Sequence, residues 1–257
     1  DLFPANMVGG CLFIPPPGGH KNVQYISETI EKESIHAVVI QPTLLNLLLD
    51  EHKGASGSYP LRSLQHVVSS GEKLFTSTAE AFLATPGLHA KLWNMYGATE
   101  AGCTYFACQK GDEARLRDYP DGVPAGVPQS YVDVFIMEET TGGDLEDPLS
   151  PVKTGQVGEI CFGGGGPAGF LAQGYWRRQD LTDQVFIDTR SYGRIYRTGD
   201  AGQWRNGEVI VCGRLDRQVK VHGVRTQPES IEAVLKRYVV GGDMPIKACL
   251  VVPTQHQ

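Results

Sequence analysis

The feature that most constrains the fold is an alternation of short apolar runs with segments of helical periodicity in the first hundred residues. The apolar runs have the length and character of buried strands, and the segments between them place apolar residues on one helical face. Strands that alternate with helices indicate βαβ units and a mainly parallel sheet, so we predict an α/β fold with mixed α+β character. In chain order the segments are helix 22–32, strand 37–40, helix 42–50, strand 64–68, helix 76–83 and strand 88–93.

After residue 100 the pattern changes, because glycine and proline turns separate short alternating runs. Runs of this kind are typical of antiparallel strands with one covered face. We therefore predict a small β region packed beside the parallel βα layer, followed by the start of a small α+β domain. Its strands are expected at residues 132–137, 159–162, 195–196 and 209–211, and a helix at 228–238 and a strand at 246–252 follow.

Charge and composition exclude several classes of partner. The chain has 257 residues, of which 29 are acidic and 23 basic, and a net charge of −6, so nucleic acid and anionic membranes are not expected partners. The sequence shows no signal peptide and no apolar run of about 18 residues, which favours a cytoplasmic protein without a membrane span. The six cysteines show no metal-type spacing, so we interpret them as reduced, mostly buried thiols.

Residues 94–100, with the sequence NMYGATE, follow directly on the last predicted strand of the parallel layer. Gly97 is expected to allow a tight turn out of that strand. Tyr96 then offers an aromatic face, Thr99 a hydroxyl group and Glu100 a carboxylate at one strand end. Ligands of open α/β sheets bind at the carboxyl ends of strands, so these groups suit a flat ring, a phosphate and a divalent cation. The alternative is a strand-to-loop corner with an ordinary exposed glutamate.

Two further clusters lie in the second half of the chain. Residues 196–200, YRTGD, place Asp200 just beyond a predicted strand and a glycine turn. Residues 213–225 are strongly basic within an acidic protein and include Arg214. Taken alone, Asp200 also fits a solvated loop acid, and Arg214 a surface ion pair of little energetic value. The glycine-rich run at 163–170 lacks the Lys-Ser/Thr pair of a phosphate loop, so we interpret it as a surface loop.

These three clusters, in this order, resemble the later core motifs of the adenylate-forming superfamily, and the nearest match is the adenylation domain of nonribosomal peptide synthetases. Two intervening runs, GEI at 158–160 and GYW at 174–176, resemble the motif that lies between them in that family. The resemblance covers nearly the whole chain and implies the adenylate-forming fold. It also implies that residues 1–215 are the carboxyl-terminal part of the large domain and that residues 216–257 begin the small, mobile domain. Because the chain starts in mid-pattern, we expect a fragment of a larger protein.

The resemblance implies a two-step reaction. ATP and a carboxylic acid, expected to be an amino acid, give an acyl-adenylate and pyrophosphate. The acyl group then passes to the thiol of a phosphopantetheine arm on a carrier domain, which is expected in the same polypeptide. Attack of a carboxylate on a phosphate brings two anions together, so Mg²⁺ and fixed donors must neutralise the developing charge. A stand-alone acyl-CoA ligase, a reductase-type module and a non-catalytic nucleotide-binding relative stay open as alternatives.

Carried over residue by residue, the first cluster supplies the nucleotide and metal contacts. Glu100 is expected to ligate Mg²⁺ and Thr99 to bond the α-phosphate, and these two are the predicted catalytic residues. Tyr96 is expected to stack on adenine, with Asn94 near the edge of the base and Gly97 in the same cofactor-binding segment.

The later clusters are expected to hold the ribose and the hinge. An ionised Asp200 is an acceptor-only group that suits both ribose hydroxyls, and Arg214 is expected to reach the same sugar. Asp216 falls at the family's hinge between the large and small domains. Lys220 and Gly223 are expected on the segment that meets the active site in the thioester-forming pose, with a plain hairpin edge as the alternative.

By position, the acyl group is expected to lie among six side chains of mixed, moderately apolar character. Such a set predicts a substrate with a small-to-medium, uncharged side chain. The six residues are Val39, Val68, Ser70, Met95, Cys103 and Thr104.

The chain departs from the family pattern in several places. Ala98 stands where the family usually has proline, which loosens the turn, and Gln173 replaces a common arginine. The lysine-bearing phosphate loop is expected before Asp1, and the lysine that contacts the reacting carboxylate is expected beyond Gln257. On this basis we predict that the chain by itself does not adenylate an acid at a useful rate.

Overall fold

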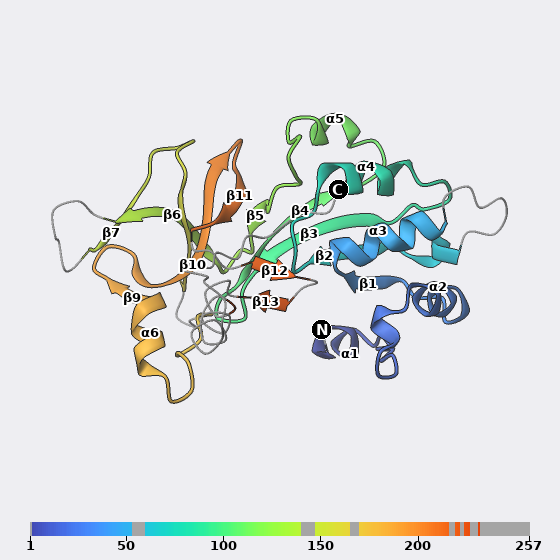
Figure 1. The fold of residues 1–257 in the computed structure, drawn as a ribbon, viewed down its shortest axis with the longest axis horizontal. Helices are drawn as coiled ribbons and strands as arrows, with labels where there is room; N and C mark the ends of the chain where they lie inside the picture. The colour runs from blue at the N-terminus through green and yellow to red at the C-terminus, as the bar shows by residue number, and fades with distance from the viewer. Residues whose placement is uncertain are drawn as a thin grey trace, which may run out of the picture.

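The computed structural model describes residues 2–52, 60–139, 147–164, 170–215, 219–221, 224–226 and 231. Two main sheets stand side by side, and most of the helices gather around the first of them (Figure 1). The first sheet comes from the earlier part of the chain, and the second from the part that follows. This order confirms the prediction of a parallel βα layer followed by a small β region.

The first sheet has the strand order β1-β2-β3-β4-β5. Strands β1, β2 and β3 pair in parallel, whereas β4 and β5 run antiparallel to their neighbours. Three parallel strands joined by helices are the βαβ arrangement that the sequence predicts. The strands are β1 (Ala37–Ile40), β2 (His66–Ser70), β3 (Lys91–Gly97), β4 (Cys103–Cys108) and β5 (Val127–Pro128).

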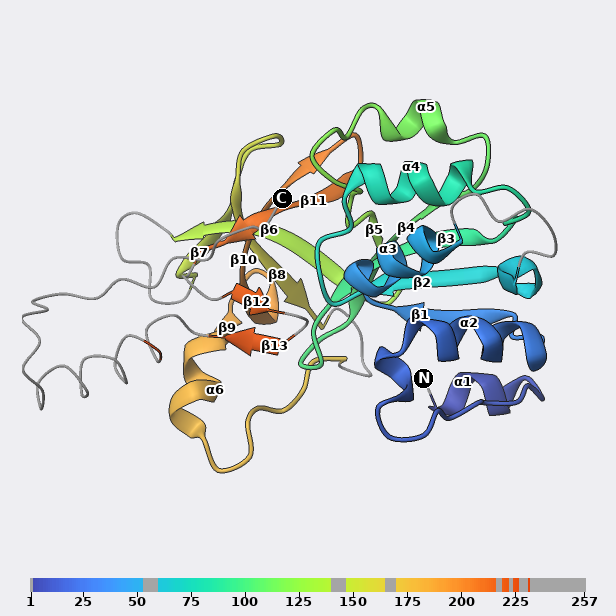
Figure 2. The same ribbon diagram turned by 45° about the vertical axis from the view of Figure 1, so that its right-hand side comes forward.

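Helices α2 (Val23–Lys32), α3 (Pro42–Glu51) and α4 (Thr76–Ala84) contribute buried side chains to the core beside the first sheet. Local sequence sets two of the helix starts. The Asn22 side chain accepts a backbone hydrogen bond at the first turn of α2, and Pro42 occupies the first turn of α3. Figures 1 and 2 both show α3 and α4 lying along β2 and β3. The core there includes Leu45, Leu48, Val67, Phe82 and Leu92.

The opposite side of the first sheet is open among the residues that the structure describes. Strand side chains alternate between the two sides of a sheet, and strand register identifies the members of each side. Val39 is 52% exposed and Tyr105 is 37% exposed, although both are large apolar side chains in strands. We call this side the open face; it carries Val39, Val68, Ser70, Trp93, Met95, Cys103 and Tyr105.

The third strand is longer at its end than the sequence predicts. The predicted strand stops at residue 93, but β3 continues to Gly97, so the first half of the NMYGATE run lies inside the strand. Gly97 is not among the glycines with positive φ, and the expectation that it opens a turn is wrong. A Cβ at this position would lie 2.6 Å from the Gly102 carbonyl oxygen and 2.7 Å from the Cys103 Cβ. Glycine is required because β4 approaches too closely for a side chain.

The second sheet is antiparallel throughout, with the strand order β11-β10-β8-β6-β7, and β9 pairs with β10. The predicted strand at residues 195–196 is the early part of β10, which spans 13 residues. The core of this sheet includes Ile160, Phe162 and Tyr196. The strands are β6 (Asp133–Glu139), β7 (Leu149–Pro151), β8 (Gly158–Gly163), β9 (Phe186–Thr189), β10 (Gly193–Arg205) and β11 (Glu208–Arg214).

Polar contacts join the two sheets. The Ala125 N–H donates to the Val209 carbonyl oxygen at 2.8 Å, and the Val209 N–H donates to the Gly126 carbonyl oxygen at 2.8 Å. The buried carboxylate of Glu208 accepts hydrogen bonds from Arg115 and from the Tyr119 hydroxyl. These contacts hold β11 against the segment between β4 and β5 of the first sheet, so the ends of β3 and β10 keep a fixed relation.

The remaining elements are short. They are α1 (Leu2–Met7), the 3₁₀ turns η1 (Gly19–Lys21) and η2 (Pro60–Ser63), α5 (Glu113–Leu116), α6 (Gln179–Val185), and the hairpin strands β12 (Val219–Val221) and β13 (Val224–Thr226). Apart from Ile231, which is helical, the helix expected at 228–238 and the strand expected at 246–252 lie outside the described residues.

Two sequence expectations about side chains and membranes can be compared with this fold. Of the five described cysteines, Cys108 and Cys161 are buried but Cys11 and Cys212 are exposed, so the expectation of mostly buried thiols is wrong for this set. Among the helices of the described ranges, not one combines the length and the apolar character that crossing a bilayer requires.

Candidate functional site

Asp200 lies on an irregularity in β10. The register between β10 and β8 shifts between Arg197 and Ala201, and Gly199 inside this bulge has φ 71°. Bulges of this kind redirect a side chain without ending the strand. The sequence places Asp200 beyond a strand, whereas the strand continues past it to Arg205. The glycine in the motif therefore serves a bulge and not a strand end.

The Asp200 carboxylate joins three strands. Its Oδ2 accepts a hydrogen bond from the Tyr96 hydroxyl at 2.7 Å, and its Oδ1 accepts one from Arg214 Nη1 at 3.0 Å. Asp200 and Arg214 are cross-strand neighbours on β10 and β11, and Arg214 Nη1 also donates to the Thr198 carbonyl oxygen at 2.8 Å. The side chains of Asp200 and Arg214 are 19% and 24% exposed. The structure thus brings Tyr96 together with Asp200 and Arg214, which lie more than a hundred positions later in the sequence.

Tyr96 lies near the end of β3 and contacts the second sheet through Asp200 and Phe162. Burial, followed by the negative charge of Asp200, raises the pKa of Tyr96. The phenol therefore stays protonated at neutral pH and donates to the carboxylate. Its ring lies in stacked geometry against Phe162, with centroids 6.1 Å apart. One side of the ring is occupied in this way by the core of the second sheet.

Glu100 sits in a turn that follows β3. The Ala101 N–H donates to the Ala98 carbonyl oxygen at 3.2 Å, so the turn closes although Ala98 replaces the usual proline. Glu100 Oε1 accepts a hydrogen bond from the Tyr175 hydroxyl at 2.7 Å. Burial, followed by the bond to Glu100, raises the pKa of Tyr175, which keeps this phenol a donor. Tyr175 and Tyr96 pack against the same buried cluster, which connects the Glu100 turn to the Asp200 network.

Strand alternation separates two sides of the site. Tyr96 and Asn94 face the covered side of the first sheet, whereas Met95 between them belongs to the open face. The Asn94 amide is buried and donates to the carbonyl oxygens of Val123 and Pro124 at 3.1 and 2.8 Å. The predicted adenine-edge residue is therefore also a structural link to the segment that precedes β5.

A cavity of 440 Å³ opens on the other side of β3. Three of the six predicted acyl-pocket residues, Ser70, Met95 and Cys103, line it, and so does Thr99. Val39 and Val68 share the open face but are not among the lining residues. Thr104 is completely buried on the covered side, because it pairs with Tyr96. The remaining lining residues are Gly97, Ala98, Ala101, Gly102, Gln129, Tyr131 and Phe170.

Several residues around the site have no predicted role in the sequence. Tyr175 lies in the GYW run, which the sequence analysis noted as a family-like motif. Its hydrogen bond to Glu100 could not be predicted from that motif. Gln129, Tyr131 and Phe170 reach the cavity from loops that carry no periodic pattern, and strand and motif reasoning gave no signal for them.

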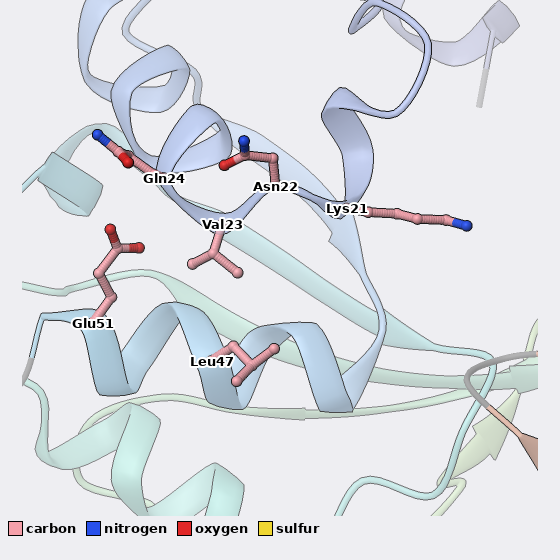
Figure 3. A pocket seen from close by; sticks show the side chains of 6 residues that line it. All are labelled: Lys21, Asn22, Val23, Gln24, Leu47 and Glu51. Atoms are coloured by element: carbon pink, nitrogen blue, oxygen red, sulfur yellow. The ribbon is translucent and has the colours of Figure 1, made fainter.

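A second hollow lies between the start of α2 and the outer side of α3 (Figure 3). It has a volume of 570 Å³ and contains none of the predicted site residues. In Figure 3 the Lys21 side chain points away from Glu51 and Gln24, so the polar groups there do not converge. The chemistry therefore concentrates at the end of β3, where Asp200, Glu100 and the 440 Å³ cavity lie.

The sequence was also compared with models of known protein families, independently of the geometry of the site. The model of the AMP-binding enzyme family matches residues 1–176, which is most of the chain. The chain belongs to the AMP-binding enzyme family.

Nonribosomal peptide synthetases are among the relatives of this AMP-binding chain. It is 32% identical over 254 residues to tyrocidine synthase 3 of Brevibacillus parabrevis, covering 97% of this chain and 4% of that protein. It is 34% identical over 243 residues to the beta-alanyl-bioamine nonribosomal peptide synthetase ebony of Drosophila melanogaster, covering 90% of this chain and 26% of that protein. The AMP-binding chain thus spans only a small part of the length of both relatives.

Solved structures of adenylation domains share the fold. The Vibrio cholerae adenylation domain AlmE, in complex with glycyl-adenosine-5'-phosphate, superposes with a TM-score of 0.67 at 26% identity, over 89% of this chain and 40% of that one. PA1221, a nonribosomal peptide synthetase protein containing adenylation and PCP domains, gives a TM-score of 0.66 at 25% identity, over 84% of this chain and 40% of that one. The adenylate-forming fold predicted from the motifs is confirmed.

The donor set of the AMP-binding chain fits one kind of metal site. Within the described ranges, His, Cys, Asp and Glu do not gather in groups of three or more that could hold a metal ion. Glu100 therefore offers a single carboxylate. Mg²⁺ is commonly held by one or two carboxylates together with waters and nucleotide phosphate oxygens. Glu100, partly exposed beside Thr99, fits a magnesium ion that arrives with its nucleotide.

The predicted hinge region lies mostly outside the described residues. Asp216 and Gly223 belong to that undescribed part, so their roles stay predictions. Lys220 is the central residue of β12, which pairs with β13 as an antiparallel hairpin. The hairpin is compatible with both readings of this segment, the second-pose segment and the plain hairpin edge.

Proposed function

We propose that the chain contributes to the ATP-dependent activation of a carboxylic acid as an acyl-adenylate, with release of pyrophosphate. The observation that supports this most is the Tyr96–Asp200–Arg214 network beside the Glu100 turn. The adenylation domain AlmE, which has the same fold, was solved with an aminoacyl-adenylate.

Asp200 is the ribose ligand in this proposal. An ionised carboxylate has about four lone-pair positions, and two hydrogen bonds from protein donors leave room for two hydroxyl groups. Tyr96 and Arg214 fix the carboxylate before the nucleotide arrives, so little ordering remains for binding. Phe162 occupies one side of the Tyr96 ring, and adenine stacks on the other.

Thr99 and Glu100 act where the acid meets the α-phosphate. The Thr99 hydroxyl donates to a phosphate oxygen, and Glu100 holds Mg²⁺ at the same strand end. When bound, the metal neutralises the negative charge that develops as the two anions approach. Tyr175 holds Glu100 by a hydrogen bond of 2.7 Å, so the carboxylate is oriented before the metal binds.

In this proposal the two reactants lie on opposite sides of β3, which agrees with the alternation of its side chains. Tyr96 faces the nucleotide and Met95 the acyl group, so the strand end lies between adenylate and acid. The 440 Å³ cavity then receives the side chain of the acid, and the carboxylate lies next to the phosphate at Thr99, which also lines the cavity. In this proposal Ser70, Met95 and Cys103, which line the cavity, are the acyl-pocket residues.

The second half-reaction is transfer of the acyl group to a phosphopantetheine thiol on a carrier domain in the cytoplasm. Two comparisons support it: the similarity to tyrocidine synthase 3, and the similarity to the PA1221 protein, which contains adenylation and PCP domains. In this proposal residues 1–215 are the carboxyl-terminal part of the large domain and residues 216–257 are the beginning of the small one. Asp216 is the hinge between the two domains. Lys220 and Gly223 then enter the site in the thioester-forming pose.

Calorimetric titration of AMP into the chain tests this proposal, because binding does not depend on turnover. Asp200→Ala removes both ribose acceptors and the shared acceptor of the hydrogen bonds from Tyr96 and Arg214, so we expect AMP affinity to fall about 100-fold. The matched control is Asp188→Ala, which removes an exposed carboxylate from the neighbouring strand β9 and leaves affinity unchanged. Equal affinity of wild type and Asp200→Ala would contradict the proposal. The inactivity of the chain alone stays a separate prediction, which pyrophosphate exchange measures.

A further inference from the structure

The far wall of the 440 Å³ cavity comes from two loops outside the family motifs. Gln129 and Tyr131 belong to the segment between β5 and β6, and Phe170 precedes the GYW run. The near wall comes from Met95 and Cys103 on the open face. The cavity is thus bounded on one side by strands and on the other by loops.

The first loop is anchored to the start of β4. The Gln129 N–H donates to the Cys103 carbonyl oxygen at 3.2 Å, and the Val132 N–H donates back to the Gln129 carbonyl oxygen at 2.9 Å. Val132 is buried, and a Cβ on Gly102 would lie 2.2 Å from Val132 Cγ2. Because Gly102 lets the loop approach this closely, Tyr131 is held at the cavity.

The second loop is anchored to the turn that carries Glu100. The Ala172 N–H donates to the Glu100 carbonyl oxygen at 2.8 Å, which fixes the chain two residues after Phe170. Both loops are therefore positioned by hydrogen bonds to backbone carbonyl oxygens of nearby residues, Glu100 and Cys103. Phe170 and Tyr131 meet there with ring centroids 4.1 Å apart and an angle of 33° between the rings.

This ring pair is fixed in place but poorly covered. Tyr131 is 47% exposed and Phe170 is 44% exposed, so both rings present apolar surface at the cavity. Among the described residues that line the cavity, not one is charged. A charged side chain in the cavity would lose hydration without gaining a counter-charge, whereas an apolar ring would cover exposed ring surface.

We propose that Tyr131 and Phe170 form an aromatic wall that selects acids with an uncharged, ring-bearing side chain. The inference rests on the proposed function, in which this cavity receives the acyl side chain. An aromatic guest gains ring-to-ring contact beyond the area it buries, and the sulfur atoms of Met95 and Cys103 favour the edges of a ring on the near wall. An aliphatic side chain of similar size gains the buried area alone.

Calorimetry with three non-hydrolysable acyl-adenylate analogues tests the aromatic wall. The probes are the phenylalanyl, leucyl and glutamyl sulfamoyl adenosines, and AMP serves as the reference for the nucleotide side. For the wild-type chain we expect the phenylalanyl analogue to bind about 3- to 10-fold tighter than the leucyl analogue. The glutamyl analogue is expected to bind about 100-fold more weakly than the phenylalanyl analogue.

Substitutions locate the preference. In Tyr131→Ala and Phe170→Ala we expect the phenylalanyl-to-leucyl preference to disappear while AMP affinity stays unchanged. Tyr131→Phe keeps the ring and is expected to keep the preference, which separates ring contact from loss of the fold. Trp176→Ala removes an exposed ring that does not line the cavity and is the matched control. Melting temperatures of all four variants show whether the loops still fold.

The outcomes distinguish the two proposals. If AMP binds with dependence on Asp200 but the three analogues bind equally, the aromatic wall is wrong and the adenylate site stands. If the preference for the ring is present but unchanged in Tyr131→Ala and Phe170→Ala, the wall is again wrong. If AMP does not bind, both the proposed function and this inference are overturned.

Discussion

The two sides of β3 are built in different ways. On the nucleotide side, Tyr96, Asp200 and Arg214 come from three strands and hold one another by hydrogen bonds of 2.7 and 3.0 Å. On the acyl side, strand residues supply one wall and loops supply the other, and the ring pair of Tyr131 and Phe170 is nearly half exposed. In the proposed function, the first side recognises the nucleotide, which is the same for every acid substrate. The second can change by loop replacement without disturbing the sheet.

This difference has an energetic side. Charge-assisted hydrogen bonds hold the nucleotide side, so loss of one partner leaves a partly buried group unpaired. On the acyl side the contacts are apolar and additive, and each substitution removes area without leaving an unpaired charge. We therefore expect single substitutions to act strongly on the nucleotide side and gradually on the acyl side.

The largest effect after Asp200→Ala is expected at Gly199, where the bulge meets Arg214. A Cβ there would lie 2.7 Å from Arg214 Nη2, and φ is 71°. We expect Gly199→Ala to lower the free energy of unfolding by about 2–4 kcal/mol, from backbone strain and overlap together, and to weaken AMP binding at least about 10-fold. Chemical denaturation and calorimetry measure the two effects.

Gly193→Ala is the matched control for that substitution. Gly193 lies in the same strand with φ 67°, but a Cβ there meets nothing within 4 Å. Its replacement is expected to cost about 1–2 kcal/mol from strain alone and to leave AMP affinity unchanged. If the two variants behave alike, the contact between the bulge and Arg214 does not organise the nucleotide side.

A smaller effect is expected for Tyr175→Phe, which removes the hydrogen bond to Glu100. We expect a loss of about 1–2 kcal/mol in the free energy of unfolding and weaker binding of ATP in the presence of Mg²⁺, by about 3- to 10-fold. AMP binding without metal is expected to stay the same. Tyr119→Phe is the control, because it removes the 2.5 Å bond from a tyrosine to Glu208 away from the site. That variant should lose stability but keep the magnesium effect.

The pH dependence of stability gives a further test of the nucleotide side. The pKa of Tyr96 is raised above its ordinary value of 10.0 by burial and by Asp200. Its contribution to stability is therefore complete below pH 10 and declines as the pH rises beyond it, because the unfolded phenol ionises first. We expect the alkaline loss of stability, measured by denaturation between pH 9 and 11 (about 1 unit on either side of this pKa), to be shallower in Tyr96→Phe. An identical decline in both proteins would show that ionisation of Tyr96 does not contribute to the alkaline loss of stability.

The smallest effect is expected on the acyl side. Ser70→Ala removes one hydroxyl from the cavity wall without changing its shape, so binding of an acyl-adenylate analogue should change by less than about 3-fold. AMP binding should be unaffected. A large loss of AMP affinity in this variant would show that the two sides of β3 are not independent.

The sequence was sufficient for the layer order and for several residues that meet at the end of β3, because both depend on local patterns. Apolar periodicity predicted the parallel strands, and the motifs identified Tyr96, Glu100, Asp200 and Arg214, which the structure brings to one strand end. What the motifs did not show was how the chain reaches that arrangement. Asp200 is aimed by a bulge within a long strand, and a bulge depends on pairing with a distant partner.

The acyl side was less accessible to sequence reasoning for a physical reason. Met95, Cys103 and Thr104 were predicted by their position relative to the family, but Thr104 pairs with Tyr96 and is buried on the opposite side. The sequence pattern could not show this, because the predicted strand stops at residue 93 whereas β3 continues to Gly97 and β4 pairs with it. Tyr131 and Phe170 reach the cavity from loops with no period of their own. Their positions depend on backbone hydrogen bonds to residues 100 and 103, which only the folded chain reveals.

The most direct measurement is a crystal structure of the chain with a non-hydrolysable phenylalanyl-adenylate analogue. We predict the ribose hydroxyls on Asp200, adenine against Tyr96 and the phenyl ring between Met95 and the Tyr131–Phe170 pair, on the other side of β3. An analogue bound away from Asp200, or with both of its ends on the same side of β3, would contradict the account.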